Sequence, residues 1–469
     1  MTSDAPPPPV APVDEVLPAK ELGTFGLQHV LGMYAGAVAV PLIVGAAFKV
    51  SPADMAVLIA ADIFTAGIAT ALTCIGIWKI GARLPIMQGC TFAAVGPIVA
   101  AAGQGHPITD VFGAIIIAGI IAVLLAPVMG KLRRFFPPLV VGTVILLIGI
   151  SLLPVAVDWA GDVFNPSPDN SVPQNLALAV GVLIFILMLQ RFANEWIKRT
   201  SIMIGIIAGT LVAIPLGFTD FGSVSDSSVF GVPRPFHFGA PTFALSVVIT
   251  MVIVMIVSMI ETTGDLIAVG EIVGKEADEA TIVGGLRADG ISSALGGIFN
   301  TFPYTAYAEN VGLVSLSGVK SRWVVATAGG IMIVLGLFPV LGAVVAAVPL
   351  PVLGGAGLVM FGTVAAIGAK TLNKVDFDHR GNLIIVATSL GIGLVPVRNE
   401  AIYEDFPQWF ITVMGSGITA GTVAVVALNY IFNELGVGGK TAQALGSTPT
   451  FVGAEEVAAA NAAKSKQLA

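Results

Sequence analysis

Acidic residues recur within apolar stretches in one part of the chain, at Glu261, Asp265, Asp289 and Glu309. Glu261 and Asp265 follow the apolar run 247–260 and are one helical turn apart, so both side chains project from one face of a helix. An ionised carboxylate at the centre of a bilayer costs at least about 2.5 kcal/mol, so acidic residues there usually face a cavity or a partner. Because burial moves the titration of a carboxyl group toward neutral pH, these residues are candidates for binding a substrate or a proton.

A structural role competes with a functional one at each acidic position. Asp289 has Arg287 two residues away, so it can pair with that side chain or cap a helix. Glu261 and Glu309 have no nearby basic residue in the sequence, which favours a functional role for both. For Asp62, which lies in an earlier apolar stretch, we favour a structural role.

His29, beside Gln28, is the only histidine in a predicted membrane span, where it can be either a structural donor or part of a site. The two cysteines, Cys74 and Cys90, lie in apolar stretches without the spacing of a zinc site or a disulfide framework. No metal or organic cofactor is expected.

Two segments place prolines, small residues and polar groups in otherwise apolar sequence, at 85–97 (PIMQGCTFAAVGP) and 301–312 (TFPYTAYAENVG). A proline alone can simply kink a helix. These segments, however, fall third in each half of the chain, and unwound backbone at membrane depth is tolerated only around a protein-lined cavity. Matched interruptions of this kind indicate the binding site of a transporter.

Composition defines the environment that these segments share. Hydrophobic residues make up 56% of the 469 residues and charged residues only 11%, against roughly 25% charged in soluble domains. The chain is therefore predicted to be an all-α polytopic membrane protein. The net charge of -7 and the absence of a continuous basic run exclude a nucleic-acid partner.

About fourteen stretches are apolar and long enough to cross a bilayer. They are expected near 24–48, 53–78, 85–103, 107–129, 137–157, 174–190, 200–220, 240–267, 280–299, 303–318, 322–345, 349–368, 381–397 and 410–434. Basic residues concentrate in the loops that follow even-numbered spans, so both termini are expected in the cytoplasm of a protein in the plasma or inner membrane. An odd number of spans in each half makes the two halves inverted repeats.

The predicted organisation has three parts. Residues 1–21, rich in proline, form a disordered cytoplasmic tail, and residues 437–469 form a second cytoplasmic tail. Residues 22–436 form the transporter domain, with inverted repeats at about 22–221 and 239–436.

Four short runs resemble the nucleobase/ascorbate transporter family, the nucleobase:cation symporters that include bacterial uracil, xanthine and uric acid permeases. They lie at 28–34 (QHVLGMY), 88–93 (QGCTFA), 261–265 (ETTGD) and 309–318 (ENVGLVSLSG). The last is similar to the family signature of an acidic or amide residue, Asn, any residue, Gly, four free positions and usually Thr. Ser317 replaces that Thr but keeps its hydroxyl.

The resemblance covers about residues 22–430 and implies fourteen spans in two inverted repeats, a core and a gate domain, short antiparallel strands in spans three and ten, and a homodimer. It also implies substrate contacts by Glu261 and Glu309. Further residues would support transport, affinity or coupling: Asn310, Asp289, Asp265, His29, Gln28, Gly312 and Ser317.

The chemistry of a nucleobase fits these residues. A carboxylate accepts hydrogen bonds from ring N–H groups, and backbone N–H groups near Phe92 and Ala308 can meet ring carbonyls. Phe92, Tyr304 and Tyr307 are candidates for stacking on a flat ring, although ordinary core packing is the alternative for each.

The motifs leave two classes of substrate, the purines xanthine and uric acid on one side and the pyrimidine uracil on the other. Purine members of the family usually carry Gln where Glu309 stands, and uracil members carry Glu, whereas the other motifs are similar to the xanthine and uric acid branch. We expect import of xanthine or uric acid by proton symport, with uracil as the alternative. An anion exchanger of the same fold would place positive charge at the site, yet spans three and ten contain no Lys or Arg. An enzyme is excluded because no nucleophile elbow or phosphate loop is present.

Overall fold

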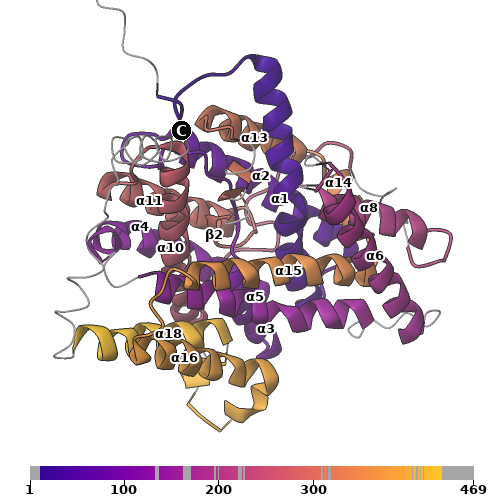
Figure 1. The fold of residues 1–469 in the computed structure, drawn as a ribbon. Coiled ribbons are helices and arrows are strands. Elements are labelled where there is room, and N and C mark those ends of the chain that lie inside the picture. The colour runs from indigo at the N-terminus through magenta and orange to yellow at the C-terminus, as the bar shows by residue number, and fades with distance from the viewer. Residues whose placement is uncertain are drawn as a thin grey trace, which may run out of the picture.

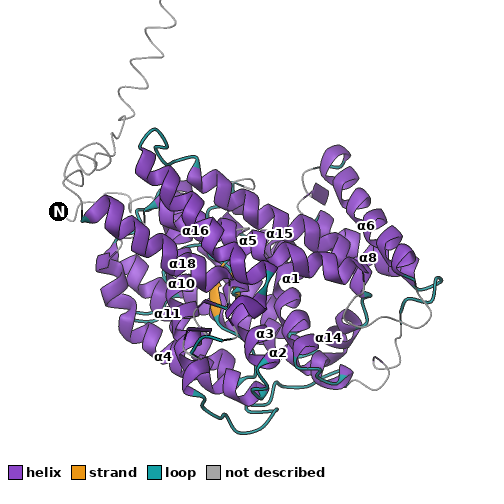
Figure 2. Cartoon of the chain, turned by 90° about the horizontal axis from the view of Figure 1, so that it is seen from below, coloured by secondary structure: helices purple, strands orange, loops and turns teal. Residues whose placement is uncertain are grey.

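The computed structural model describes residues 11–132, 137–161, 171–194, 197–198, 200–219, 224, 228–307, 310–311, 313–314, 318–403, 405–407, 410–411, 414–415 and 417–435. Helices dominate, and they surround a small sheet near the centre of the molecule (Figures 1 and 2). The main helices are α1 (Ala19–Ala47), α2 (Pro52–Ile75), α3 (Val95–Gly103), α4 (Ile108–Leu132), α5 (Pro138–Gly161), α6 (Val172–Phe192), α8 (Ser201–Ala213), α10 (Leu245–Val273), α11 (Glu279–Ile298), α13 (Arg322–Leu335), α14 (Pro339–Ala346), α15 (Leu350–Leu372), α16 (Arg380–Arg398) and α18 (Gly417–Asn429). Short 3₁₀ or π turns lie at η1 (Phe92–Ala94), η3 (Glu400–Tyr403) and η4 (Tyr430–Glu434).

Helix boundaries follow local sequence signals. α2 begins where the Ser51 hydroxyl accepts the N–H of Asp54 and Pro52 occupies the first turn, and it ends at Gly76, whose φ is +72°. α10 ends at Gly274 in the left-handed conformation, and the Asp278 carboxylate caps α11 by accepting the N–H of Thr281. These caps stop the helices where the predicted loops lie.

In the described part of the chain, eight helices are long and apolar enough to cross a membrane, and the bent pair α13 and α14 makes a ninth. The predicted span 322–345 is bent by 86° between α13 and α14. Pro339 starts α14, and a Cβ on Gly336 would come within 2.6 Å of the Phe64 backbone, so this corner packs tightly on α2. The predicted spans three and seven contain only short apolar helices, η1–α3 and α8.

The helices pack in two groups. α1, α2, α3, α4, α10, α11, α13 and α14 form the first group, in which α11 packs on α4 and α13 packs on α2. α5, α6, α8, α15, α16 and α18 form the second group, which is built on the pairing of α5 with α15. Close helix approach depends on glycine, as is usual in membranes. An added Cβ on Gly67, for example, would lie 2.6 Å from the backbone of Gly329 on α13.

Two short strands join the interrupted segments, as predicted. β1 (Gln88–Cys90) pairs antiparallel with β2 (Tyr304–Ala306), with Gln88 opposite Ala306 and Cys90 opposite Tyr304. Both strands are fully buried in the first helix group, and β1 contacts α2 while β2 contacts α10 and α11. The sheet is therefore enclosed by helices in the interior of the protein.

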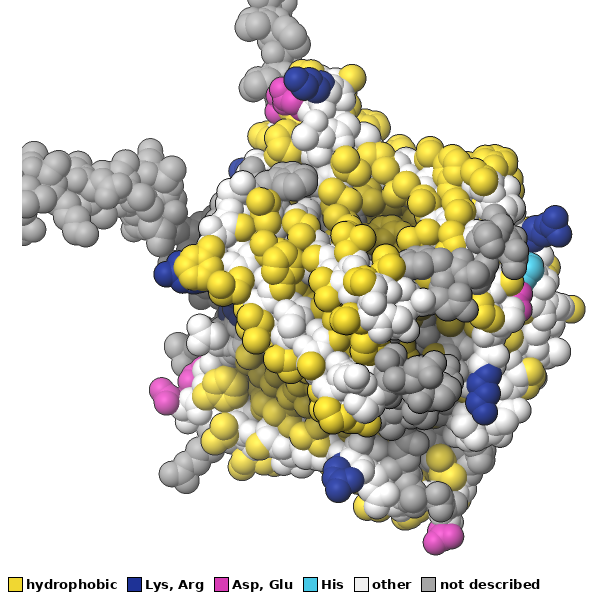
Figure 3. Space-filling view, turned by 90° about the vertical axis from the view of Figure 1, so that its right-hand side faces the viewer, with side chains coloured by type: hydrophobic (Ala, Val, Ile, Leu, Met, Phe, Trp, Pro, Cys, Tyr) yellow, Lys and Arg dark blue, Asp and Glu magenta, His cyan; other side chains and the backbone are white. Residues whose placement is uncertain are grey.

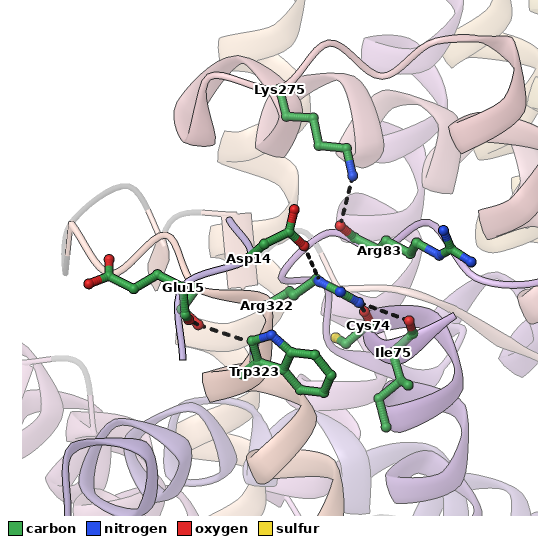
Figure 4. A network of polar contacts seen from close by, with 9 residues as sticks. Asp14, Glu15, Cys74, Ile75, Arg83, Lys275, Arg322 and Trp323 are labelled. Carbon is green, nitrogen blue, oxygen red and sulfur yellow. Dashed lines mark hydrogen bonds and ion pairs between the residues drawn. The ribbon is translucent and has the colours of Figure 1, made fainter. Parts of the chain in front are cut away.

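The segment before α1 lies against the helices, which differs from the disordered tail predicted for 1–21. Val13 is buried, and its carbonyl accepts the backbone N–H of Arg322. Arg322 Nε also donates to Asp14 Oδ1 at 2.6 Å, while its guanidinium reaches the carbonyls of Cys74 and Ile75 at the end of α2 (Figure 4). The composition indicated disorder because these contacts come from residues about 300 positions away.

The outer surface of the second group is apolar. Exposed hydrophobic side chains cover α6 and α8, and Figure 3 shows hydrophobic side chains spread over one face of the molecule with few charges among them. A groove of about 600 Å³ on this group is lined mainly by small and aliphatic side chains of α6 and α8. Such a surface is suited to lipid rather than to water.

Candidate functional site

The outward-facing backbone groups of the two strands are satisfied by helix side chains. The N–H of Gln88 donates to the Thr70 hydroxyl of α2 at 2.9 Å, and the N–H of Tyr304 donates to the Ser293 hydroxyl of α11 at 2.9 Å. The N–H of Ala306 donates to the Thr262 hydroxyl of α10 at 3.1 Å. Because unpaired backbone groups are costly away from water, these hydroxyls allow extended backbone at this depth.

Two buried carboxylates hold opposite ends of the sheet. At one end, Gln88 Nε2 donates to Asp289 Oδ1 at 2.7 Å, and Asp289 is fully buried in α11. At the other end, Asp62 of α2 is fully buried and accepts from side chains on both interrupted segments. The proposed pairing of Asp289 with Arg287 is wrong, because Arg287 donates instead to the carbonyl of Lys79.

Asn310 connects the second interrupted segment to α1 and to the first segment. Its Nδ2 donates to the Pro85 carbonyl at 2.9 Å, and its Oδ1 lies 2.7 Å from His29 Nδ1. Since an amide oxygen only accepts, His29 carries its proton on Nδ1 in this arrangement, which leaves Nε2 as an acceptor in the neutral ring. Gln28 and His29 are both buried. His29 therefore lies beside Asn310, and the resemblance predicts a site role for both residues.

Two aromatic rings lie beside the sheet. Phe92 and Tyr307 are stacked with centroids 6.3 Å apart and planes at 13°, and the Tyr307 hydroxyl donates to the Cys90 carbonyl at 3.1 Å. Gly89 and Gly36 leave room for them, since a Cβ on Gly89 would lie 2.3 Å from the Tyr307 ring. A flat ring between two others needs contacts of about 3.5–4.0 Å on each side, so insertion of a nucleobase requires one of these rings to move.

Tyr304 is not available for stacking on a ligand. Its ring is fully buried, and its hydroxyl donates to Asp62 Oδ1 at 2.7 Å. The pairing of Tyr304 with Cys90 in the sheet turns the side chain toward α2 rather than toward Phe92. Of the three aromatic candidates, Phe92 and Tyr307 come together and Tyr304 has a structural partner.

Glu261 lies on α10 where this helix meets β2. The next residue, Thr262, accepts the N–H of Ala306, and its hydroxyl lies 3.0 Å from that of Thr305. Glu261 is partly exposed, and Gly264, three residues later on the same side of α10, faces Val141 of α5. Glu261 therefore projects toward the boundary between the two helix groups. Asp265, one turn further along, is buried.

The second helix group contributes aromatic side chains to this boundary. Phe361 of α15 makes an edge contact with Phe92 at 5.7 Å between centroids, and Trp159 of α5 lies 6.4 Å from Phe361. The site therefore lies where the two groups meet, with its polar groups in the first group and an apolar wall in the second.

Four residues predicted at the site, Ala308, Glu309, Gly312 and Ser317, lie outside the described residues. Five of the others gather near the sheet: His29 lies with Asn310, and Phe92 with Tyr307, beside the α10 turn that carries Glu261. Asp289 bonds to Gln88 of β1, and Gln28 and Asp265 are buried outside these two clusters. Sequence reasoning missed Phe361 and Trp159, although each is the only aromatic residue of its helix. It also missed Gln88 as the partner of Asp289, although its polar type within an apolar segment was a signal.

Two interrupted membrane segments are joined by a small sheet, and apolar helices enclose that sheet. This arrangement is that of a polytopic membrane transporter. A family model described as "Permease family" matches residues 20–402. The chain is 44% identical to the xanthine permease of Bacillus subtilis over 87% of this chain and 93% of that protein. It is 43% identical to the uric acid transporter UacT of Escherichia coli over 91% of this chain and 89% of that protein. The chain therefore belongs to the nucleobase/ascorbate transporter family and is a permease rather than an enzyme.

A solved structure shares the fold at low sequence identity. The structure of murine Solute Carrier 26 family member A9, an anion transporter in the inward-facing state, matches with a TM-score of 0.59 at 14% identity. The match covers 88% of this chain and 68% of that chain. This likeness establishes the fold of the helical part. It does not identify the substrate, which has to be inferred from the residues of the site.

Proposed function

We propose that the protein is a secondary active transporter that imports xanthine or uric acid by proton symport. The observation that carries this proposal is the meeting of the His29–Asn310 pair, the Phe92–Tyr307 stack and the Glu261 turn of α10 at the boundary of two helix groups. A purine dione or trione presents N–H donors and carbonyl acceptors on a flat ring. A carboxylate, an imidazole acceptor and aromatic faces match those features.

Relatives support the purine branch over uracil. The two relatives above are a xanthine permease and a uric acid transporter, and the chain aligns with nearly the full length of both proteins. Uracil is the second candidate because Glu309 stands where purine members usually carry Gln. An ionised Glu accepts hydrogen bonds only, whereas Gln also donates, so this residue is the natural point of discrimination.

Buried carboxylates support protons as the coupling ion. Asp289 is fully buried in α11, and Asp265 is buried one turn after Glu261 in α10. An acidic side chain that alternates between a proton and a hydrogen-bonded ligand couples the two without a metal site. An anion exchanger is less well supported, because segments 85–103 and 301–318 contain no Lys or Arg.

The two helix groups correspond in this proposal to the core and gate domains of a fourteen-span protein with inverted repeats at about 22–221 and 239–436. The end of the molecule where Arg83, Lys275 and Arg322 gather would face the cytoplasm, together with both termini (Figure 4). A homodimer in the plasma or inner membrane completes the arrangement.

The test is uptake of labelled xanthine, uric acid and uracil into cells that express the protein, with each unlabelled base as competitor and a protonophore as control. Xanthine or urate uptake that the protonophore abolishes supports the proposal. Uptake of uracil alone moves the assignment to the second candidate. Uptake of no base, with the protein detected in the membrane, contradicts the proposal, and uptake that resists the protonophore contradicts proton coupling.

A further inference from the structure

The sequence predicted only a structural role for Asp62. In the structure, three hydrogen-bond donors meet at one oxygen of this side chain. Asp62 Oδ1 accepts from the Cys90 thiol at 2.6 Å, from the Thr301 hydroxyl at 2.5 Å and from the Tyr304 hydroxyl at 2.7 Å. The side chain is fully buried in α2. The arrangement is costly to disturb, because Asp62 Oδ1 is the acceptor that these three buried donors share.

These donors come from both interrupted segments. Cys90 is the last residue of β1, Tyr304 is the first residue of β2, and the two are opposite each other in the sheet. Thr301 lies three residues before Tyr304. One oxygen of α2 therefore fixes both strands at the same end of the sheet.

Both rings of the aromatic pair are tied to this end of the sheet, although the backbone of Tyr307 bonds to Met87 at the other end. The Cys90 carbonyl accepts the Tyr307 hydroxyl, and Phe92, which stacks on Tyr307, follows Cys90 by two residues. The N–H of Thr91 donates to the Pro303 carbonyl at 2.8 Å, which joins the same two segments again. A shift of Cys90 away from Asp62 would therefore move both rings.

We propose that Asp62 is a positioning residue that holds the two interrupted segments in register and thereby sets the position of Phe92 and Tyr307 for substrate binding. This inference rests on the proposed function. It makes Asp62 the counterpart of Asp289, which holds the other end of β1 through Gln88. In the proposed inverted repeats, α2 and α11 occupy equivalent places, each directly before an interrupted segment.

Replacing Asp62 by Asn distinguishes a positioning role, which needs only the side-chain oxygen, from a role that needs the negative charge. An Asn side chain keeps an oxygen for the three donors, and its amide takes the place of Oδ2, which is buried and has no hydrogen-bond partner in the described part of the chain. We expect Asp62→Asn to retain most of the wild-type uptake rate with KM within about twofold. Asp62→Ala removes the shared acceptor and leaves the donors only longer contacts, with the residue 62 carbonyl and with one another. We therefore expect uptake to fall on the order of tenfold or more with a raised KM.

Removing a single donor tests the same role of Asp62 without leaving a cavity at position 62. Tyr304→Phe removes one of the three donors without creating a cavity, and we expect a raised KM and a changed ranking of xanthine, urate and uracil as competitors. Thr65→Val, one turn from Asp62 in α2, is the matched control. Its hydroxyl is buried and makes no hydrogen bond within the described residues, so uptake should be unchanged.

The experiment is labelled xanthine uptake by wild type and these variants, normalised to the protein in the membrane and accompanied by the melting temperature of each purified variant. Retained transport in Asp62→Asn with raised KM in Asp62→Ala and Tyr304→Phe supports positioning. Equal loss in Asp62→Asn and Asp62→Ala overturns it in favour of a charge-dependent role. Unchanged KM and competitor ranking in Tyr304→Phe, with only a lower melting temperature, also overturns it. If wild type itself transports no nucleobase, the proposed function fails, and the positioning role of Asp62 that rests on it fails as well.

Discussion

Gln88 and Asp289 are 201 positions apart in the sequence, and the Gln88 amide donates to the Asp289 carboxylate at 2.7 Å. Gln88 belongs to the first interrupted segment and Asp289 to α11 of the second half, so this bond joins the two halves at the sheet. Neither residue is exposed. Its loss is therefore expected to act on the stability of the protein and on the geometry of the site together.

Asp289→Ala should lower the free energy of unfolding by about 1–3 kcal/mol, because the buried Gln88 amide loses its acceptor. Uptake should fall with it. The double variant Gln88→Leu/Asp289→Ala should be less destabilised than the sum of the two single variants, since neither polar group then remains unpaired. Thermal melting of the purified proteins measures both, and strict additivity would show that the bond contributes no coupling.

His29→Asn should retain more transport than His29→Gln. The Asn amide nitrogen occupies nearly the place of imidazole Nδ1, which donates to Asn310, whereas the longer Gln side chain places its amide nearer to Nε2. We expect a KM for His29→Asn within a few fold of wild type and a larger increase for His29→Gln. Initial uptake rates over a range of xanthine concentrations give both values. The reverse order would mean that Nε2, and not the bond to Asn310, is the atom that matters.

Gly89→Ala should abolish uptake, because its Cβ would lie 2.3 Å from the Tyr307 ring and would displace Tyr307 from Phe92. Gly103→Ala is the matched control, since no atom lies within 4 Å of its Cβ, and its uptake should equal that of wild type. Both variants are compared at equal amounts in the membrane. Full activity of Gly89→Ala would show that the stacked rings of Phe92 and Tyr307 are not needed for transport.

Glu261→Gln should abolish substrate accumulation while the protein still inserts into the membrane. The amide cannot exchange a proton and presents a donor where ring N–H groups need an acceptor. The measurement is concentrative uptake of xanthine with and without a protonophore. Accumulation at the wild-type level by this variant would contradict proton-coupled transport through Glu261.

Glu309→Gln should change substrate preference, since the amide adds a donor that the ionised carboxylate lacks. We expect xanthine and urate to become stronger competitors relative to uracil. Inhibition of labelled uptake by each unlabelled base gives the ranking. An unchanged ranking would exclude Glu309 from the residues that select the substrate.

Local sequence was sufficient to predict the interrupted segments, because Pro85, Pro303 and the neighbouring polar residues are incompatible with continuous lipid-facing helices. It also placed His29 and Asn310 in the site, which the structure brings together. The family resemblance, rather than periodicity, singled out each of these two residues, and their contact is a finding of the structure. The fourteen spans and their inverted repeats stay predictions.

Contacts between distant segments could not be read from the sequence. The partner of Asp289 is Gln88 rather than the nearby Arg287, and the role of Asp62 depends on three donors that follow it by 28 to 242 positions. Phe361 and Trp159 are each the only aromatic residue of their helix, but the sequence does not show that they face Phe92 across the boundary. The bend between α13 and α14 lies at Gly336 and Pro339, a local pattern that signals a break, whereas the packing of this corner on Phe64 could not be read from the sequence.

The clasp between Asp14 and Arg322 spans 308 positions, and the bond between Tyr307 and Cys90 spans 217. A ribosome makes the first partner of each pair long before the second, at about 5–20 residues per second. During that interval the buried polar groups of β1 and the side chain of Asp14 lack their native neighbours. The sheet is therefore completed late in biosynthesis, and a nascent chain stalled in the first half holds a polar segment that its own helices cannot cover.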